Sequence, residues 1–240
     1  MLKNLIRNLL QKLLGFDRYV FFFSLIHITR IRWGISESAF RYFVSMITEE
    51  GVILDIGANI GSMTVVFAKT HPNTTIYSFE PIPGNRKALE RVIRFYRLTH
   101  VKVFAHALGD HNGMVEMVMP YAGGSKMQGL SHVVETGSPE SGERYSIPVQ
   151  QLDKMEVLRS VEKISAIKID VENFEYFVLK GGRDLLQKHR PLVFCELWDN
   201  ERRNLCFDLM EQLGYRVKVF QQGRLTDFIG NKALDFFFLP

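Results

Sequence analysis

The chain has 240 residues, 46% of them hydrophobic and 23% charged, with a formal net charge of +4 and a pI near 9.0. This is an ordinary globular composition, long enough for one large domain or one domain with an N-terminal extension. The mild positive charge is spread along the chain without a nucleic-acid-binding motif, which argues against a nucleic-acid partner. Cys195 and Cys206 form neither a disulfide framework nor a CxxC metal pattern, so we expect reduced thiols in a cytoplasmic protein.

Residues 1–14 carry leucine and isoleucine at helical spacing, with Lys3, Arg7 and Lys12 on the other side. This pattern predicts an amphipathic helix. Two interpretations stay open. The first, which we favour because leucine stripes pack on protein more often than on lipid, is an arm against its own domain or against a second subunit in a homo-oligomer. The second is a helix lying on an anionic membrane surface, which would place the protein peripherally at the inner face of the membrane.

The next apolar run, residues 19–28, is soon followed by Arg30 and Arg32. It is well short of the roughly 20 residues that cross a bilayer, and no small-residue cleavage site follows it to indicate a signal peptide. A second helical region is expected around 36–49. We therefore assign residues 1–50 to an N-terminal helical extension and residues 51–240 to a second, larger domain.

From residue 51 onward, apolar strands alternate with helices. Strands are expected at 52–56, 75–79, 101–105, 164–169, 192–196, 215–220 and 235–239, and helices at 63–69, 86–96, 174–180 and 200–213. Apolar strands separated by helices predict a parallel sheet covered on both faces. The last two strands lie close together in the sequence, which favours an antiparallel pair at one edge.

The segment 111–146 interrupts this alternation. It is rich in Gly and Ser and has no long apolar period, although GMVEMVMP and RYSIPV could pair as a hairpin at its base. A long irregular insert in a compact domain is usually either functional or disordered. Because the segment leaves the sheet after the third strand, near the expected ligand crevice, we expect a loop that covers the substrate.

The stretch LDIGANIG, residues 54–61, ends the first strand, where open α/β sheets bind ligands. A dinucleotide fingerprint would need glycine where Asn59 and Ser62 stand. We expect Gly57 to let the backbone approach a ligand and Gly61 to let the helix start tight against the strand. Glu80, at the end of the next strand, could accept both hydroxyl protons of a ribose. The set suits a nucleoside without a pyrophosphate, such as S-adenosylmethionine.

Four segments carry a family resemblance: VILDIGANIGSMTVVFA, YSFEPIPGN, HALGD and IKIDVENFEYFVLKGG. They are similar to the FkbM family of S-adenosylmethionine-dependent methyltransferases, over about residues 51–240. The resemblance implies a class I methyltransferase (Rossmann-like) α/β fold, with a seven-stranded mixed sheet in the order 3-2-1-4-5-7-6. It also implies O-methylation, mostly of sugars or natural-product hydroxyls.

The same resemblance implies site residues. Asp55, Gly57, Asn59 and Gly61 would border the methionine end of the cofactor, Glu80 would hold the ribose, Ala107 and Leu108 would lie beside the adenine, and Asp170 and Glu172 would face the reaction centre. The chain departs from the family at Asn173, where glycine is usual. Because asparagine tolerates the left-handed backbone conformation, we expect the same turn.

Transfer to a hydroxyl requires a base, because an alcohol is a poor nucleophile until its proton is removed. We hypothesise Asp170 or Glu172 as this base, with Glu196 of the fifth strand as a further candidate. A less favoured alternative is Mg²⁺ held by Asp170, Glu196 and Asp199. Glu175, one turn into a helix, is better explained as a capping residue than as a catalyst.

The leading hypothesis is an S-adenosylmethionine-dependent O-methyltransferase of a sugar, glycan or similar polyhydroxyl or natural-product acceptor. One alternative keeps the cofactor and changes the target to a protein or nucleic acid. The sequence lacks the N/D-P-P-Y/F motif of amino-methylating DNA and glutamine enzymes, which argues against this target. Another alternative is a non-catalytic nucleoside-binding module at a membrane. The acids at both strand ends argue against a pure binding role.

Overall fold

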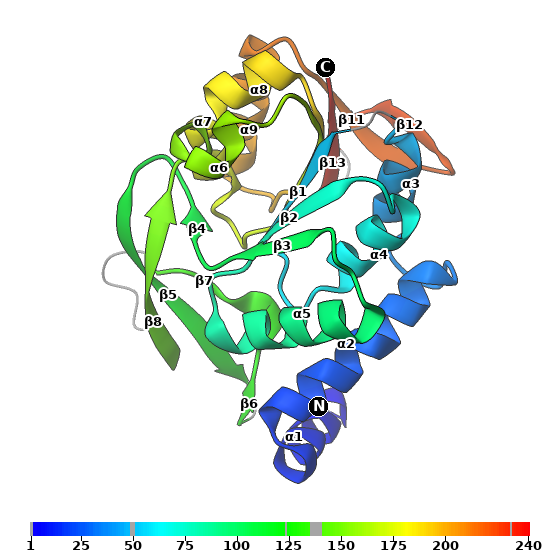
Figure 1. Ribbon diagram of the computed structural model, residues 1–240, viewed down its shortest axis with the longest axis vertical. Helices are drawn as coiled ribbons and strands as arrows, with labels where there is room; N and C mark the ends of the chain where they lie inside the picture. The colour runs from blue at the N-terminus through cyan, green and yellow to red at the C-terminus, as the bar shows by residue number, and fades with distance from the viewer. Residues whose placement is uncertain (1, 49–50, 123, 135–140, 231) are drawn as a thin grey trace.

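The computed structural model describes residues 2–48, 51–122, 124–134, 141–230 and 232–240. Its centre is one twisted sheet (Figure 1). The strands are β1 (Val52–Ile56), β2 (Thr75–Phe79), β3 (Val101–Phe104), β9 (Ile164–Ile169), β10 (Leu192–Glu196), β11 (Arg216–Gln221), β12 (Arg224–Asp227) and β13 (Asp235–Leu239). They lie in the order β12-β11-β13-β10-β9-β1-β2-β3, parallel from β10 to β3 and antiparallel from β10 to β12.

The sheet has eight strands, one more than the expected seven. Gln222 and Gly223 both adopt positive φ, of 50° and 81°, and close a two-residue hairpin that adds β12 outside β11. Such turns match the twist of paired strands. Without β12, the remaining strands follow the order 3-2-1-4-5-7-6 when numbered along the chain. The expected antiparallel pair of the last two predicted strands is β11 with β13.

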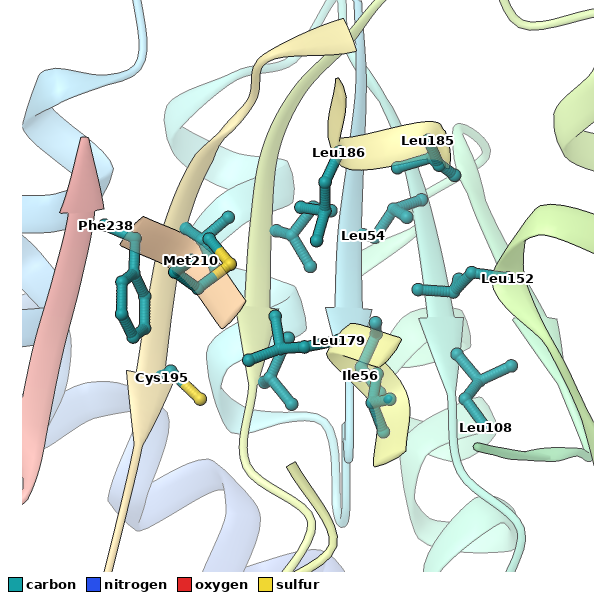
Figure 2. Packing of buried hydrophobic residues seen from close by; sticks show 14 of the residues in the cluster. Leu54, Ile56, Leu108, Leu152, Leu179, Leu185, Leu186, Cys195, Met210 and Phe238 are labelled. Carbon is teal, nitrogen blue, oxygen red and sulfur yellow. The ribbon is translucent and has the colours of Figure 1, made fainter. Parts of the chain in front are cut away.

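One face of the sheet is covered by helices from the second half of the chain. They are α6 (Glu156–Arg159), α7 (Glu175–Gly181), α8 (Arg183–His189) and α9 (Glu201–Gln212), together with the 3₁₀ turn η2 (Leu152–Lys154). Figure 2 shows Leu186 and Leu179 from these helices beside Leu54 and Ile56 of β1, and Met210 from α9 farther across the same face, toward Phe238 of β13. Because successive strand residues point to opposite faces, Ile53, directly before Leu54, belongs to the other core.

The other face is covered by helices from the first half of the chain. These are α2 (Phe16–Arg32), α3 (Ser38–Met46), α4 (Ser62–Thr70) and α5 (Pro83–Tyr96). The apolar run at 19–28 is therefore part of a helix that contributes Ile28 to the core, and α3 falls inside the predicted helical region 36–49. The predicted N-terminal amphipathic helix is α1 (Leu2–Leu14). Within the described residues, no helix has the length and apolarity needed to cross a bilayer.

The segment predicted to be irregular is mostly a second, small sheet. Its parts are β4 (Ala107–Leu108), β5 (Gly113–Ala122), β6 (Ser125–Lys126), the 3₁₀ turn η1 (Gln128–Leu130), β7 (His132–Val133) and β8 (Gly142–Gln150). The predicted hairpin is confirmed, because β5 pairs antiparallel with β8 along most of its length. Residues 135–140 of the insert lie outside the described residues. The expectation of an irregular loop is thus wrong for most of the insert, which places η1 over the ends of the main strands.

Candidate active site

Two cavities meet at the carboxyl ends of β1, β2 and β9. The larger, of about 300 Å³, lies between the glycine-rich turn after β1, the start of α4, η1 and the helices α1 and α2. The smaller, of about 60 Å³, lies between Glu80, the start of α5 and the turn after β9. Both cavities are lined by Gly57, Asn59 and Asp170, and by Gln128 of η1. The insert therefore lies over the crevice, as the sequence led us to expect.

The two glycines of the turn are required by contacts within the chain. Gly57 has φ 77°, and a Cβ there would lie 1.8 Å from the backbone oxygen of Asp170. At Gly61, with φ 83°, a Cβ would lie 2.7 Å from Leu89 Cδ1. Gly61 thus allows α5 to pack on the start of α4, whereas the expected close contact was with a strand. Gly57 brings the turn against β9, so both glycines are needed before any ligand binds.

Glu80 ties the turn to the next helix. Its Oε2 accepts a hydrogen bond from the backbone N–H of Asn59, and its Oε1 accepts one from that of Ile82, both at 2.8 Å. The side chain is 4% exposed, and this burial raises the pKa of Glu80 to about 7 although the two N–H groups oppose the shift. Glu80 also lines the smaller cavity, and a carboxylate has more acceptor positions than these two bonds use. The geometry is compatible with the predicted ribose contact.

Asp55 lies beneath the turn and lines neither cavity. Its carboxylate is fully buried, and Thr64 Oγ1 donates a hydrogen bond to it at 2.5 Å. Burial raises the pKa of Asp55, and the nearby ammonium group of Lys168, 3.6 Å from Oδ1, opposes that shift. Asp55 therefore supports the turn from within the core, in contrast to the expectation that it borders the ligand.

Lys168 is a site residue that the sequence argument missed. Its Nζ donates a hydrogen bond to the carbonyl of Gly57 at 2.9 Å and lies 3.3 Å from Oδ2 of Asp170. Burial lowers the pKa of Lys168, but Asp170 and Asp55 together raise it above the ordinary value. The signal was present in the strand ISAIKI, where a lysine in a wholly buried strand needs a charged partner.

The three predicted catalytic carboxylates differ in access. Asp170 lines both cavities, Glu172 lines the smaller one, and Glu196 lines neither. Burial, followed by repulsion from Asp170 and Glu196, raises the pKa of Glu172 to about 8. Burial, and after it the repulsion from Asp170 and Asp235, raises the pKa of Glu196 to about 7. The structure thus brings Asp170 and Glu172 to the crevice and leaves Glu196 behind them.

The turn after β9 has the conformation expected for it. Asn173 is left-handed, with φ 73°, a conformation that asparagine tolerates better than most residues. Asn200 donates a hydrogen bond to the side-chain oxygen of Asn173 at 2.7 Å. Glu175 Oε1 accepts hydrogen bonds from the backbone N–H groups of Val171 and Asn173, both at 3.1 Å. These N–H groups precede α7, which has no side-chain cap hydrogen bond, so Glu175 stabilises the turn before the helix and the expected cap is not formed.

Two further expectations meet a different geometry. Ala107 and Leu108 are buried in hydrophobic clusters and line neither cavity, and the smaller cavity is bordered instead by Ile82 and Met117. Asp199, a member of the alternative Mg²⁺ set, forms an ion pair with Arg203. Among the residues that the structure describes, no group of three or more His, Cys, Asp and Glu side chains could hold a metal ion.

The open sheet, its strand order and a ligand crevice beside the glycine-rich turn define the class I methyltransferase fold. Residues 55–217 match the family model described as the methyltransferase FkbM domain. The chain therefore belongs to the FkbM methyltransferase family. It is a methyltransferase, and S-adenosylmethionine is the methyl donor of that family and fold.

Several known proteins are similar to this chain. The "2-O-methyltransferase NoeI" of Sinorhizobium fredii is 30% identical over 172 residues, which cover 67% of this chain and 69% of the relative. The "31-O-demethyl-FK506 methyltransferase FkbM" of Streptomyces tacrolimicus is 27% identical over 157 residues, which cover 55% of this chain and 60% of the relative. A crystal structure of a methyltransferase FkbM from Methylobacillus flagellatus matches with a TM-score of 0.52 and 18% identity. That match covers 79% of this chain and 43% of the crystallised one, and it supports the fold alone.

Proposed function

We propose that the protein transfers the methyl group of S-adenosylmethionine to a hydroxyl group of a sugar, glycan or similar polyhydroxyl acceptor. One observation carries the proposal: Asp170 lines both cavities, so one carboxylate can face the cofactor on one side and an acceptor on the other. The names of two relatives, a 2-O-methyltransferase and a 31-O-demethyl-FK506 methyltransferase, support transfer to oxygen.

The residues around the crevice suit S-adenosylmethionine. Glu80 offers acceptor positions for a ribose diol, as argued above. The side-chain oxygens of Asn59 and Asn85 are buried without a hydrogen-bond partner among the described residues. Both residues line the smaller cavity. Unpaired buried acceptors are costly, so their place beside Glu80 favours a ligand that brings N–H or O–H donors.

The cofactor supplies a methyl group on a positively charged sulfur, and the chain supplies alignment and a base. Correct alignment of the two reactants can contribute roughly 7–11 kcal/mol. Asp170 would accept the proton of the acceptor hydroxyl, because a neutral alcohol is a weak nucleophile. Lys168 Nζ, 3.3 Å from Oδ2 of Asp170, would hold that carboxylate in place. Thus a base and its positioning residue come from one strand end.

Glu172 is the second candidate for the base. Its pKa of about 8 means that only part of the population is ionised at neutral pH, so a rate that depends on Glu172 would rise as the pH passes through about 8. The Glu172→Gln variant would then lose this rise. If Asp170 is the base, Glu172→Gln would retain most of the activity.

The test separates cofactor binding from transfer. Asp170→Asn should bind S-adenosylhomocysteine in calorimetry almost as the wild type does. Its transfer of labelled methyl groups to a panel of glycans and polyols should fall by about 10²–10⁴-fold. Asp208→Asn, on the exposed side of α9, is the matched control and should behave as the wild type. Unchanged transfer by Asp170→Asn, or label found only in protein or nucleic acid, would refute the proposal.

A further inference from the structure

The first helix presents several apolar side chains to the outside. Leu9 is 56% exposed and Leu13 is 71% exposed, and Ile6, Leu10 and Leu14 are exposed too. The polar side of the helix faces the protein, where Gln11 donates a hydrogen bond to the carbonyl of Lys126 at 3.2 Å and accepts one from its N–H at 3.1 Å. An amphipathic helix held in this orientation leaves much of its apolar stripe exposed, as far as its side chains are described.

The second helix adds a similar stripe. Phe22 and Ile26, with Trp33 directly after the helix, are spaced four and seven residues apart and so lie on one side. They are 49%, 60% and 77% exposed. α1 packs on α2, and the two helices form one end of the molecule (Figure 1). We call these side chains of α1 and α2 the N-terminal apolar face. Exposed apolar clusters of this kind mark interaction sites.

The charges around this face determine what can cover it. Lys12, Arg18, Arg30 and Arg32 are exposed, and none of them pairs with a carboxylate within the described ranges. Asp17 is the one acidic residue in the sequence of the two helices. A second copy of the chain docked through the same face would bring these cations together. An anionic lipid surface would complement them while it accepts the apolar side chains.

We propose that the N-terminal apolar face docks this methyltransferase on an anionic lipid bilayer. The same helices also wall the larger cavity, through Arg7 of α1 and through Phe23 and His27 of α2. The α2 residue Ser24 donates a hydrogen bond to the carbonyl of Ile60 in the glycine-rich turn at 3.1 Å. Docking would therefore bring the cavity close to the lipid. Resting on the proposed function, the proposal names lipid-linked polyhydroxyl compounds as the acceptor class.

Vesicle flotation tests the docking without reference to catalysis. The wild type should float with phosphatidylcholine vesicles that contain phosphatidylglycerol, and more weakly with phosphatidylcholine alone. The double variant Leu9→Glu/Leu13→Glu should lose at least about 10-fold of this binding. Leu205→Glu/Ile229→Glu is the matched control, because it adds the same charge at exposed apolar positions elsewhere, and it should float like the wild type.

Both double variants should bind S-adenosylhomocysteine as the wild type does, which shows that they are folded. A wild type that stays with the soluble fraction would overturn the docking, and so would a Leu9→Glu/Leu13→Glu variant that floats unchanged. A dimer in light scattering that this variant abolishes, without flotation of the wild type, would assign the face to a second copy and overturn the proposal.

The acceptor class has its own readout. The protein and labelled S-adenosylmethionine are added to a total cell extract. The extract is then divided into a lipid fraction and a water-soluble fraction. The proposal expects the label on hydroxyl groups in the lipid fraction. Label on water-soluble glycans alone would overturn the acceptor class and leave the proposed function standing. Absence of hydroxyl methylation in both fractions, with cofactor binding intact, would overturn the proposed function and, with it, the acceptor class that rests on it.

Discussion

The ammonium group of Lys168 and the carboxylate of Asp170 lie 3.3 Å apart at the end of one strand, with Lys168 only 2% exposed. The same ammonium group contacts buried Asp55 and the carbonyl of Gly57. Lys168 thus neutralises the buried carboxylate of Asp55 below the turn and orients the carboxylate of Asp170 at the crevice. Because these partners come from two strands, the charge also fixes the turn after β1 against the end of β9.

Removal of the Lys168 charge should therefore destabilise the fold. Lys168→Met leaves Asp55 buried without its cation, and breaking a buried pair in this way costs about 3–5 kcal/mol. Urea unfolding should show this loss, and Asp55→Asn/Lys168→Met should recover much of it. Lys218→Met, which breaks the exposed pair with Asp227, is the control and should barely move the midpoint. Equal effects of the two lysine substitutions would contradict the assignment.

Alanine at Gly57 should be far more harmful than alanine at Gly223. Both glycines have φ near 80°, at 77° and 81°, so both substitutions incur the left-handed penalty of about 1–2 kcal/mol. Only at Gly57 would the new Cβ meet a backbone atom, at 1.8 Å, whereas nothing lies within 4 Å at Gly223. We expect Gly57→Ala to lose at least about 1–3 kcal/mol more in thermal unfolding. Similar losses in both variants would show that the contact with Asp170 is unimportant.

The Glu80 carboxylate should be needed for cofactor affinity. Glu80→Gln replaces one oxygen by an N–H₂ group that faces the N–H of either Asn59 or Ile82. A hydrogen bond to a charged group contributes about 1.5–3 kcal/mol, so we expect affinity for S-adenosylhomocysteine to fall by about 10–100-fold in calorimetry. Glu90→Gln on the outer side of α5 is the control. Wild-type affinity in Glu80→Gln would exclude the ribose contact.

Ionisation of Glu175 should destabilise the fold as the pH rises above 4.5. Burial raises the pKa of Glu175 from its ordinary value of 4.5 to about 7, so the folded state holds this proton more tightly than the unfolded state. The contribution of protonated Glu175 to the free energy of unfolding is complete below pH 4.5 and is lost as the pH rises through about 7. Glu175→Gln keeps an acceptor oxygen for the N–H groups of Val171 and Asn173 and removes the charge. The variant should reduce the stability difference between pH 5 and pH 8 by about 3 kcal/mol in urea titrations. An unchanged difference would contradict this role.

Much of the site could be predicted from the sequence, because its signals are local. An apolar strand that ends on LDIGANIG predicted the turn after β1, and the position of Glu80 at the next strand end predicted its place by the crevice. The left-handed conformation of Asn173 followed from the conformational preference of that residue. Such features depend on neighbours along the chain, so the sequence alone determines them.

Only the tertiary structure decided which groups lie against the turn. Lys168 reaches Gly57 across 111 positions of sequence, and the partner that requires Gly57 to lack a side chain is the backbone of Asp170. The pairing of β1 with β9 places Asp55 in the core. The packing of α2 brings Phe23 to the wall of the larger cavity. Strand register and helix packing set these contacts, and each is fixed by the burial of apolar surface over the whole sheet. No local pattern in the sequence carries that information.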